Sequence, residues 1–226
     1  MEIGNIPEIG WNKSSEGVVK SMPSLNTAGY SMELVQLSPH AKYELNGPKT
    51  IVCLLRGTLK GKHAPALRKS SLIDGRVSFK AGSDGCLLFV CIDHDGDYAY
   101  FENISGLKVT WEQFDSNMYK TTPQIHVDGY RINLWYLDSD KHGGIHNHAT
   151  EPLPFVEFHT QLRGHGWMVK YEDKDGKKET ERVEMRQGYT HDLFCSTDRK
   201  QPIYPWHEYI AGNNGTLFIA FEDTAI

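Results

Sequence analysis

The stretch Glu157-Phe-His-Thr-Gln-Leu-Arg-Gly164 decides the fold expected of this 226-residue chain, because an earlier segment repeats its ending. That earlier segment, Thr50-Ile-Val-Cys-Leu-Leu-Arg-Gly57, shares Leu-Arg-Gly at an offset of 107 residues. A second matching pair, Phe79-Lys-Ala-Gly82 and Met185-Arg-Gln-Gly188, lies at an offset of 106. Two such similar offsets indicate a duplicated unit of about 100 residues.

Apolar residues around these segments follow the two-residue period of β-strands or form short continuous runs. Turn signals such as Asp74-Gly75 and Asp175-Gly176 separate the runs. We therefore expect an all-β chain. A short helix is expected over 110–119, where three apolar residues stand at helical spacing. The strands are expected near residues 30–37, 51–55, 77–79, 86–92, 130–137, 155–162, 167–171, 181–185 and 216–221.

Composition narrows the class of protein. Aromatic residues make up 11% of the chain and charged residues 23%, which gives enough apolar area for a folded core. The net charge of −5, without a basic block, predicts no nucleic-acid partner. The longest apolar run, 86–92, is far shorter than the roughly 20 residues of a membrane helix, and no apolar signal segment opens the chain. We expect a cytoplasmic protein that binds a small molecule and no membrane.

The second half of the chain holds the residues that can carry chemistry. His146 and His148 are two residues apart, so an extended backbone directs both imidazoles to the same side. The same alternation places Glu157, His159 and Gln161 on one face of the next strand. Polar groups in a row on a buried face cost free energy unless a metal, a ligand or internal water satisfies them. The pattern therefore predicts a polar cavity.

These residues resemble the motifs of the cupin superfamily, G(X)5HXH(X)3–4E(X)6G followed by a second motif that ends in a Pro-rich turn and a further His. His146-Asn-His148 matches HXH, Glu157 to Gly164 matches E(X)6G, and Pro205-Trp-His207 matches the closing turn. The resemblance implies a metal site made of His146, His148, Glu157 and His207. Eight residues separate His148 from Glu157, so a longer loop is expected at the mouth of the barrel.

The resemblance also implies an architecture of two jelly-roll barrels in tandem, a bicupin. We expect an N-terminal arm over 1–28, a barrel without metal ligands over 29–110, a linker over 111–128 and a metal-binding barrel over 129–226. The first barrel lacks the ligands because Thr50 stands where the second half has Glu157. Many cupins are dimers, so a homodimer is a candidate assembly.

Two of the implied ligands have rivals. Glu151 competes with Glu157, and His191 competes with His207. If His191 is not a ligand, it can act as an acid or base, or hold another group by a hydrogen bond. Glu208 and Tyr209 follow His207, and one of them is expected on the cavity side. The candidate catalytic residues are His159, His191, Gln161, Glu208 and Tyr209.

Three imidazoles and one carboxylate can hold Fe, Mn, Co, Ni, Cu or Zn, so the ligands imply one divalent transition metal without naming it. Open positions on such an ion accept a substrate or oxygen. We expect a metal-dependent enzyme acting on a small polar metabolite. An oxygenase or dioxygenase is the first candidate, because the resembling family often catalyses such reactions. An isomerase, cyclase or lyase is the alternative within the same frame. A sugar or metabolite binding protein without turnover is the alternative from another class.

Overall fold

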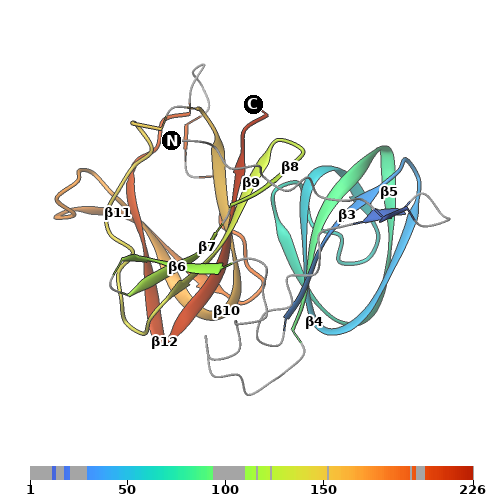
Figure 1. Ribbon diagram of the computed structural model, residues 1–226, viewed down its shortest axis with the longest axis horizontal. Helices are drawn as coiled ribbons and strands as arrows, with labels where there is room; N and C mark the ends of the chain where they lie inside the picture. Colours follow the sequence, from blue (N-terminus) through green and yellow to red (C-terminus); the bar gives the residue numbers. More distant parts are fainter. Residues whose placement is uncertain are drawn as a thin grey trace. The chain divides into compact units, whose positions relative to one another are not determined.

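The computed structural model describes residues 12–13, 18–20, 30–93, 110–115, 117–122, 124–151, 153–193, 195–196 and 202–225. These residues form strands, turns and loops but no helix, which confirms the all-β class. None of them, accordingly, belongs to a helix with the length and hydropathy to cross a membrane. The chain divides into two compact units, Met1–Thr110 and Trp111–Ile226 (Figure 1).

The first unit contains a five-stranded sheet in the order β1-β2-β3-β5-β4. Its strand β4 lies between two stretches of β5, because Ile51 pairs with both Leu72 and Cys91. Buried and exposed residues alternate at the start of β4, as the two-residue period predicts. The strands are β1 (Asn12–Lys13), β2 (Val18–Lys20), β3 (Tyr30–Leu37), β4 (Lys42–Lys60) and β5 (Ser70–Asp93).

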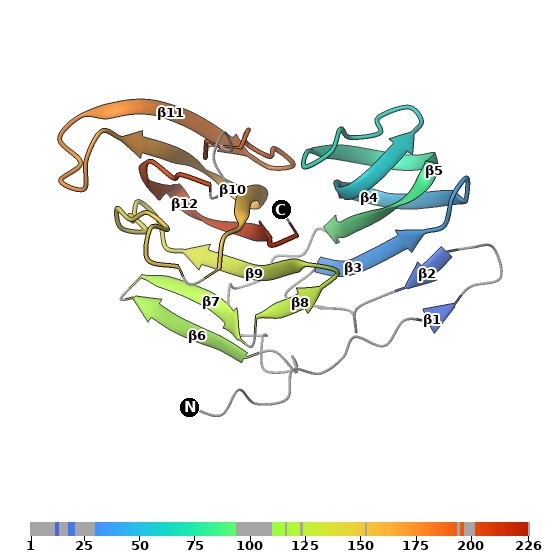
Figure 2. The ribbon, with the colours of Figure 1, turned by 90° about the horizontal axis from the view of Figure 1, so that it is seen from above.

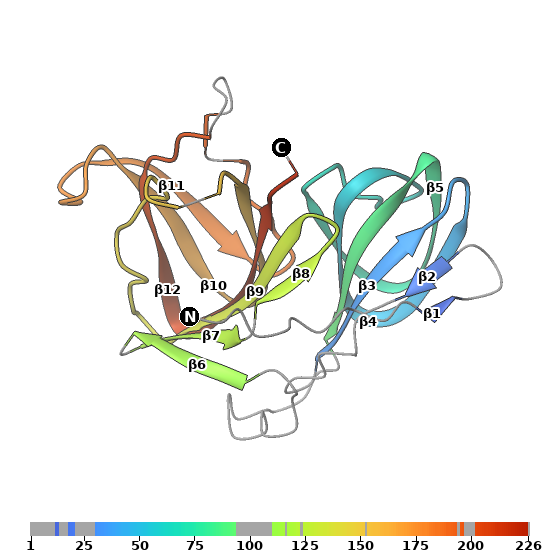
Figure 3. The same cartoon turned by 45° about the horizontal axis from the view of Figure 1, so that its top comes forward.

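The second unit contains a seven-stranded sheet, in which β11-β10-β12-β9-β7-β6 follow one another and β8 pairs with β9. Figure 2 shows β6, β7 and β9 side by side, and Figure 3 shows β10 beside β12. The pairings among the described residues do not close this sheet into a barrel. The strands are β6 (Thr110–Asp115), β7 (Met118–Thr122), β8 (Ile125–Val127), β9 (Tyr130–Leu137), β10 (Val156–Tyr171), β11 (Glu179–Arg186) and β12 (Trp206–Asp223).

The helix expected over 110–119 is wrong, because this segment forms β6 and the start of β7. Strand β7 pairs with β9, with Met118 opposite Leu137 and Lys120 opposite Trp135. The neighbouring strand supplies the backbone hydrogen bonds, and tertiary pairing overrides a short apolar spacing that fits either structure. Residues 111–128, expected as a linker, contribute β6, β7 and β8 to the second unit. Of the expected arm over 1–28, only β1 and β2 lie within the described residues.

The repeated Leu-Arg-Gly ends in the same backbone conformation in both units. Gly57 and Gly164 have φ angles of 80° and 71°, in the left-handed region that glycine tolerates. A Cβ at Gly57 would lie 2.2 Å from the carbonyl oxygen of Gly85, and one at Gly164 would lie 2.2 Å from that of Gly215. The shared sequence therefore marks a shared close approach of two chain segments.

Strands β10 and β12 pair along two halves that turn toward each other. Residues 156–164 of β10 pair with 216–223 of β12, and residues 166–171 pair with 206–211, with irregular register around Gly164. Tyr209 and Phe218, from opposite halves of β12, stack with ring centroids 4.2 Å apart. A strand whose two halves touch in this way must bend, and the bend lets one pair of strands line two sides of a cavity.

We predict that Gly164→Ala lowers the free energy of unfolding of the chain by about 3 kcal/mol or more, because the new methyl group meets a backbone oxygen and the φ angle is strained. The matched control is Gly75→Ala, since Gly75 has a φ of 88° but no atom within 4 Å of the added Cβ. That variant should lose only about 1 kcal/mol. Denaturant unfolding measures both, and equal losses would contradict the role assigned to Gly164.

Candidate metal centre

Backbone pairing places His146 next to His207. The N–H of His146 donates to the carbonyl of His207 at 3.0 Å, and the N–H of His207 donates to the carbonyl of His146 at 2.9 Å. Residues directly opposite in an antiparallel pair have their side chains on the same side. The two imidazole rings accordingly lie with their centroids 4.4 Å apart. The bridge thus joins the HXH segment to the Pro-Trp-His turn expected from the sequence.

His148 is held by two aromatic rings, one just before β10 and one just before β12. Its imidazole meets Phe155 and Tyr204 edge to face, with centroids 4.9 and 4.5 Å apart. The Tyr204 hydroxyl accepts the N–H of Glu157 at 2.6 Å and donates to the carbonyl of Phe155 at 3.0 Å. The loop between His148 and Glu157 is therefore fastened at the point where both side chains enter the site.

The nitrogens of His146, His148 and His207 lie within 4.8 Å of one another. The Nδ1 atoms of His146 and His207 face the carbonyls of Gly144 and Pro205, at 2.9 and 3.0 Å. Because a carbonyl can only accept, each Nδ1 carries the proton and each Nε2 keeps its lone pair. Donors about 2.1 Å from one ion lie about 3 Å apart at right angles, so a small approach of these three side chains would let them hold one transition metal.

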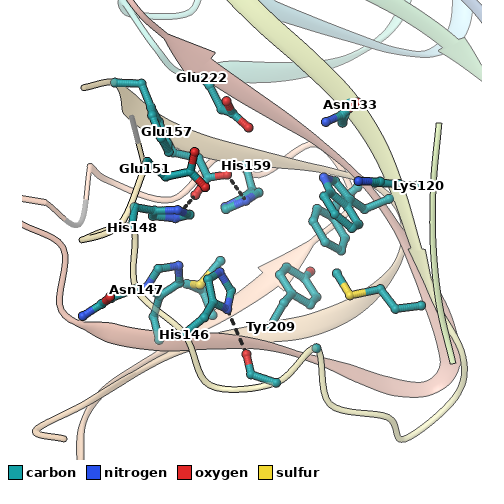
Figure 4. Close-up of a pocket in the computed structure, with 18 of the residues that line it drawn as sticks. Lys120, Asn133, His146, Asn147, His148, Glu151, Glu157, His159, Tyr209 and Glu222 are labelled. Carbon is teal, nitrogen blue, oxygen red and sulfur yellow. Dashed lines mark hydrogen bonds and ion pairs between the residues drawn. The ribbon is translucent and has the colours of Figure 1, made fainter. Parts of the chain in front are cut away.

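Glu157 is the carboxylate in contact with this group. Its Oε2 lies 3.0 Å from Nε2 of His148, and its Oε1 lies 3.3 Å from Nε2 of His159. Burial alone would raise the pKa of Glu157, but His159 and His148 hold it well below its usual range. Glu157 is therefore ionised, as a metal ligand must be. Its rival Glu151 is exposed and lines the same pocket (Figure 4).

The pKa values of His207 and His148 are shifted in opposite directions. Burial, reinforced by the charge of His146, lowers the pKa of His207 to about 3. Burial alone would also lower the pKa of His148, but the hydrogen bond and charge of Glu157 raise it. His207 is thus a neutral ligand at physiological pH, and a metal ion would have to displace any proton that His148 shares with Glu157.

A pocket of about 660 Å³ opens beside these donors. Figure 4 shows Glu157, His159 and Glu222 on one side of it and His146 and Tyr209 on the other. Cross-strand register sets one wall, because Glu157 pairs with Glu222 and Glu222 pairs with Arg131 on successive strands β10, β12 and β9. The other lining residues include Met118, Lys120, Gln124, Asn133, Trp135, Met168 and Phe218.

His159 and Tyr209, two of the candidate catalytic residues, line the pocket. His191 is buried behind His159, with its Nε2 atom 2.8 Å from Nδ1 of His159 and its Nδ1 atom 2.7 Å from the carbonyl of Asp192. The Asp192 carbonyl fixes the proton on Nδ1 of His191, which leaves Nε2 to accept from His159. His191 therefore supports His159 and does not join the three-histidine group. This geometry favours the supporting role over the ligand role.

Gln161 and Glu208 do not line the pocket. Gln161 is fully buried beneath it and accepts the hydroxyl proton of Tyr209 at its Oε1 atom. Glu208 lies on the face of β12 opposite His207 and Tyr209. There its oxygens contact the Tyr171 hydroxyl at 2.5 Å and Nδ1 of His142 at 3.1 Å. Of the two residues that follow His207, Tyr209 is the one on the cavity side.

Sequence reasoning missed several polar residues of the pocket wall. Arg131 and Glu222 form an ion pair at 2.5 Å, and Gln124 donates to Glu222 at 3.3 Å. Burial, the charge of Glu157 and that of Glu151 raise the pKa of Glu222 to about 7, against the opposing effects of Arg131 and His148. The available signal was the alternation of Arg131, Asn133 and Trp135 along 130–137, which resembles that of Glu157, His159 and Gln161.

The chain was compared with family models, curated proteins and solved structures. No family model matches the chain, and no curated protein matches it. Among solved structures it is similar to a cupin 2 conserved barrel domain protein from Leptotrichia buccalis, with a TM-score of 0.37 and 13% identity over 94% of this chain and 92% of that one. It is also similar to AerE from Microcystis aeruginosa, at 0.35 and 13% over 94% and 95%. A Lactobacillus farciminis oxalate decarboxylase formate complex gives 0.38 and 11% over 97% and 85%. Cupin proteins are thus among its structural neighbours.

We predict that His146→Ala and His207→Ala each weaken metal binding at least about 10-fold, because each removes one nitrogen donor. The control is His142→Ala on the same segment, whose side chain is 60% exposed and contacts Glu208 instead of the histidine group. Elemental analysis after dialysis against graded chelator measures the affinity. Unchanged metal content in the first two variants would show that the site is wrongly assigned.

We predict that Glu222 makes the metal-free chain less stable as the pH rises. Its folded-state pKa of about 7 exceeds the unfolded value of 4.5, so its contribution is fully present below pH 4.5 and is lost as the pH rises through 7. Relative to the wild type, Glu222→Gln should gain about 2–3 kcal/mol of unfolding free energy between pH 5 and pH 8. Glu172→Gln, at an exposed site, is the control. A pH-independent difference for Glu222→Gln would refute the raised pKa.

Proposed function

We propose that the chain is a metal-dependent enzyme that acts on a small polar metabolite, with one divalent transition metal held by His146, His148, His207 and Glu157. The observation that supports this is the convergence of three imidazoles at the wall of a pocket of about 660 Å³. A structural metal site is closed by its ligands, whereas a catalytic site keeps positions that face a cavity. The placement of this group favours catalysis.

When bound, such an ion supplies Lewis acidity or redox chemistry next to the substrate. The protein's own contribution is to hold the donors and to place an acid–base group beside them. His159 lines the pocket, and His191 fixes its ring from behind through the 2.8 Å contact. The Nε2 edge of His159, 3.3 Å from Glu157, can therefore hold or move a proton. Gln161 fixes the hydroxyl of Tyr209, so that ring serves as a rigid wall.

We further propose that each of the two units, Met1–Thr110 and Trp111–Ile226, is built on a cupin-type barrel, and that only the second binds metal. The common turn at Gly57 and Gly164 supports the duplication. Within the described part of the first unit, no three His, Cys, Asp or Glu side chains converge. The homodimer and the cytoplasmic location stay predictions.

The reaction class has two versions. An oxygenase or dioxygenase is the first, since a histidine-rich site with open positions suits iron and oxygen. The second class is an isomerase, cyclase or lyase. The fixed position of His159 against His191 favours this class, because such reactions move a proton. A binding protein without turnover would need the pocket but not the metal.

The chain, purified without chelators, should contain one metal ion and turn over at least one member of a panel of small hydroxy, oxo and aromatic acids. Iron with oxygen uptake supports the oxygenase, and another metal with exchange of substrate hydrogen for deuterium from D2O supports the isomerase or lyase. His159→Asn should slow proton transfer at least about 100-fold with metal content unchanged. Ligand binding that survives metal removal, with no turnover, would contradict the enzyme.

A further inference from the structure

We propose that the substrate is an organic acid with a flat apolar body, whose anionic group binds Lys120 at the end of the pocket away from the histidines. The inference rests on the proposed function for the end that faces the metal donors. Figure 4 shows Lys120 separated from His146 and His148 by the length of the pocket. All three residues line that pocket.

The register of the sheet places a cation beside an aromatic surface. Lys120 on β7 is directly opposite Trp135 on β9, and its ammonium lies 5.8 Å from the centre of the Trp135 ring. Trp135 is in turn opposite Phe218 on β12, and Phe218 stacks on Tyr209. A cation over an indole face is held in place, so the ammonium has a defined position before any ligand arrives.

The far wall is suited to a flat ligand. Trp135, Phe218 and Tyr209 present aromatic rings to the pocket, and the thioethers of Met118 and Met168 also line it. Aromatic rings stack on other flat groups, and methionine adapts to them. A pocket of this kind buries the body of a ligand and leaves a few polar groups to fix its orientation.

The histidine end of the pocket is unfavourable for an anionic group of the ligand unless that group binds the metal. Glu157 and Glu222 face each other across β10 and β12, and Glu151 lines the same region. Arg131 pairs with Glu222 at 2.5 Å. Like charges repel strongly where water is scarce, so these carboxylates direct an incoming anion toward Lys120. The two ends therefore orient the substrate.

The size of the ligand follows from the strand spacing. Strands β10 and β7 are three places apart in the order β10-β12-β9-β7. Three spacings amount to about 14 Å on a flat sheet, and less on a curved one. A molecule with one ring and a short acidic side chain fits between the donors on β10 and the ammonium on β7.

The test compares 3-phenylpropionate with its neutral analogue 3-phenylpropanamide by calorimetric titration into the full chain, with and without Mn²⁺. The acid should bind at least about 10-fold more tightly than the amide, because only the acid has a charge for Lys120 to pair with. Lys120→Gln should abolish this preference, and Lys120→Arg should retain it. Lys178→Gln, at a site 70% exposed on the same unit, should leave it unchanged.

The proposal is overturned if the wild type binds acid and amide equally or binds neither, or if folded Lys120→Gln keeps the preference. Trp135→Leu should weaken the binding of both ligands, because it removes the stacking surface, and should also reduce the preference for the acid, because it removes the ring that holds the Lys120 ammonium in place. Metal content is measured in every sample. A wild type that prefers the acid but holds no metal would contradict the proposed enzyme and leave the anion site standing.

Discussion

The double hydrogen bond between the backbones of His146 and His207 is the constraint on which the site depends. It fixes two imidazoles on one side of a ladder, and the same ladder continues to Gly143, whose N–H donates to the carbonyl of Tyr209 at 2.8 Å. Once His207 faces the pocket, alternation along β12 directs Tyr209 inward and Glu208 outward. One short bridge thus determines which side chains can meet a metal or a substrate.

The bend of β10 and β12 brings Glu157 close to the histidine group. Without it, Glu157 and His207 would belong to distant parts of two long strands, since their Cα partners are Glu222 and Lys170. With the bend, Nε2 of His148 lies 3.0 Å from Oε2 of Glu157, and the ring centroids of His148 and His207 lie 5.2 Å apart. The glycine at position 164, which tolerates the close carbonyl of Gly215, makes this approach possible. Local backbone freedom therefore serves the chemistry of a site several residues away.

The sequence predicted the parts of this structure that depend on local periodicity. The all-β class followed from the two-residue pattern, and the polar row of Glu157, His159 and Gln161 followed from alternation. The helix over 110–119 failed because three apolar residues at helical spacing cannot reveal that β9 lies beside them. The inward orientation of Arg131 and Asn133 was missed for a similar reason. Polar residues alternating with apolar ones suit either a solvated face or a lined cavity, and only the neighbouring strands decide between them.

The central claim is that His146, His148, His207 and Glu157 bind one metal ion, and anomalous scattering from crystals of the chain grown without chelators tests it most directly. Data collected on either side of the absorption edge of the metal found by elemental analysis would locate the ion independently of the protein atoms. We predict one anomalous peak within about 2.0–2.3 Å of Nε2 of the three histidines and of an oxygen of Glu157. A peak elsewhere, or none in a crystal soaked with the metal, would contradict the account.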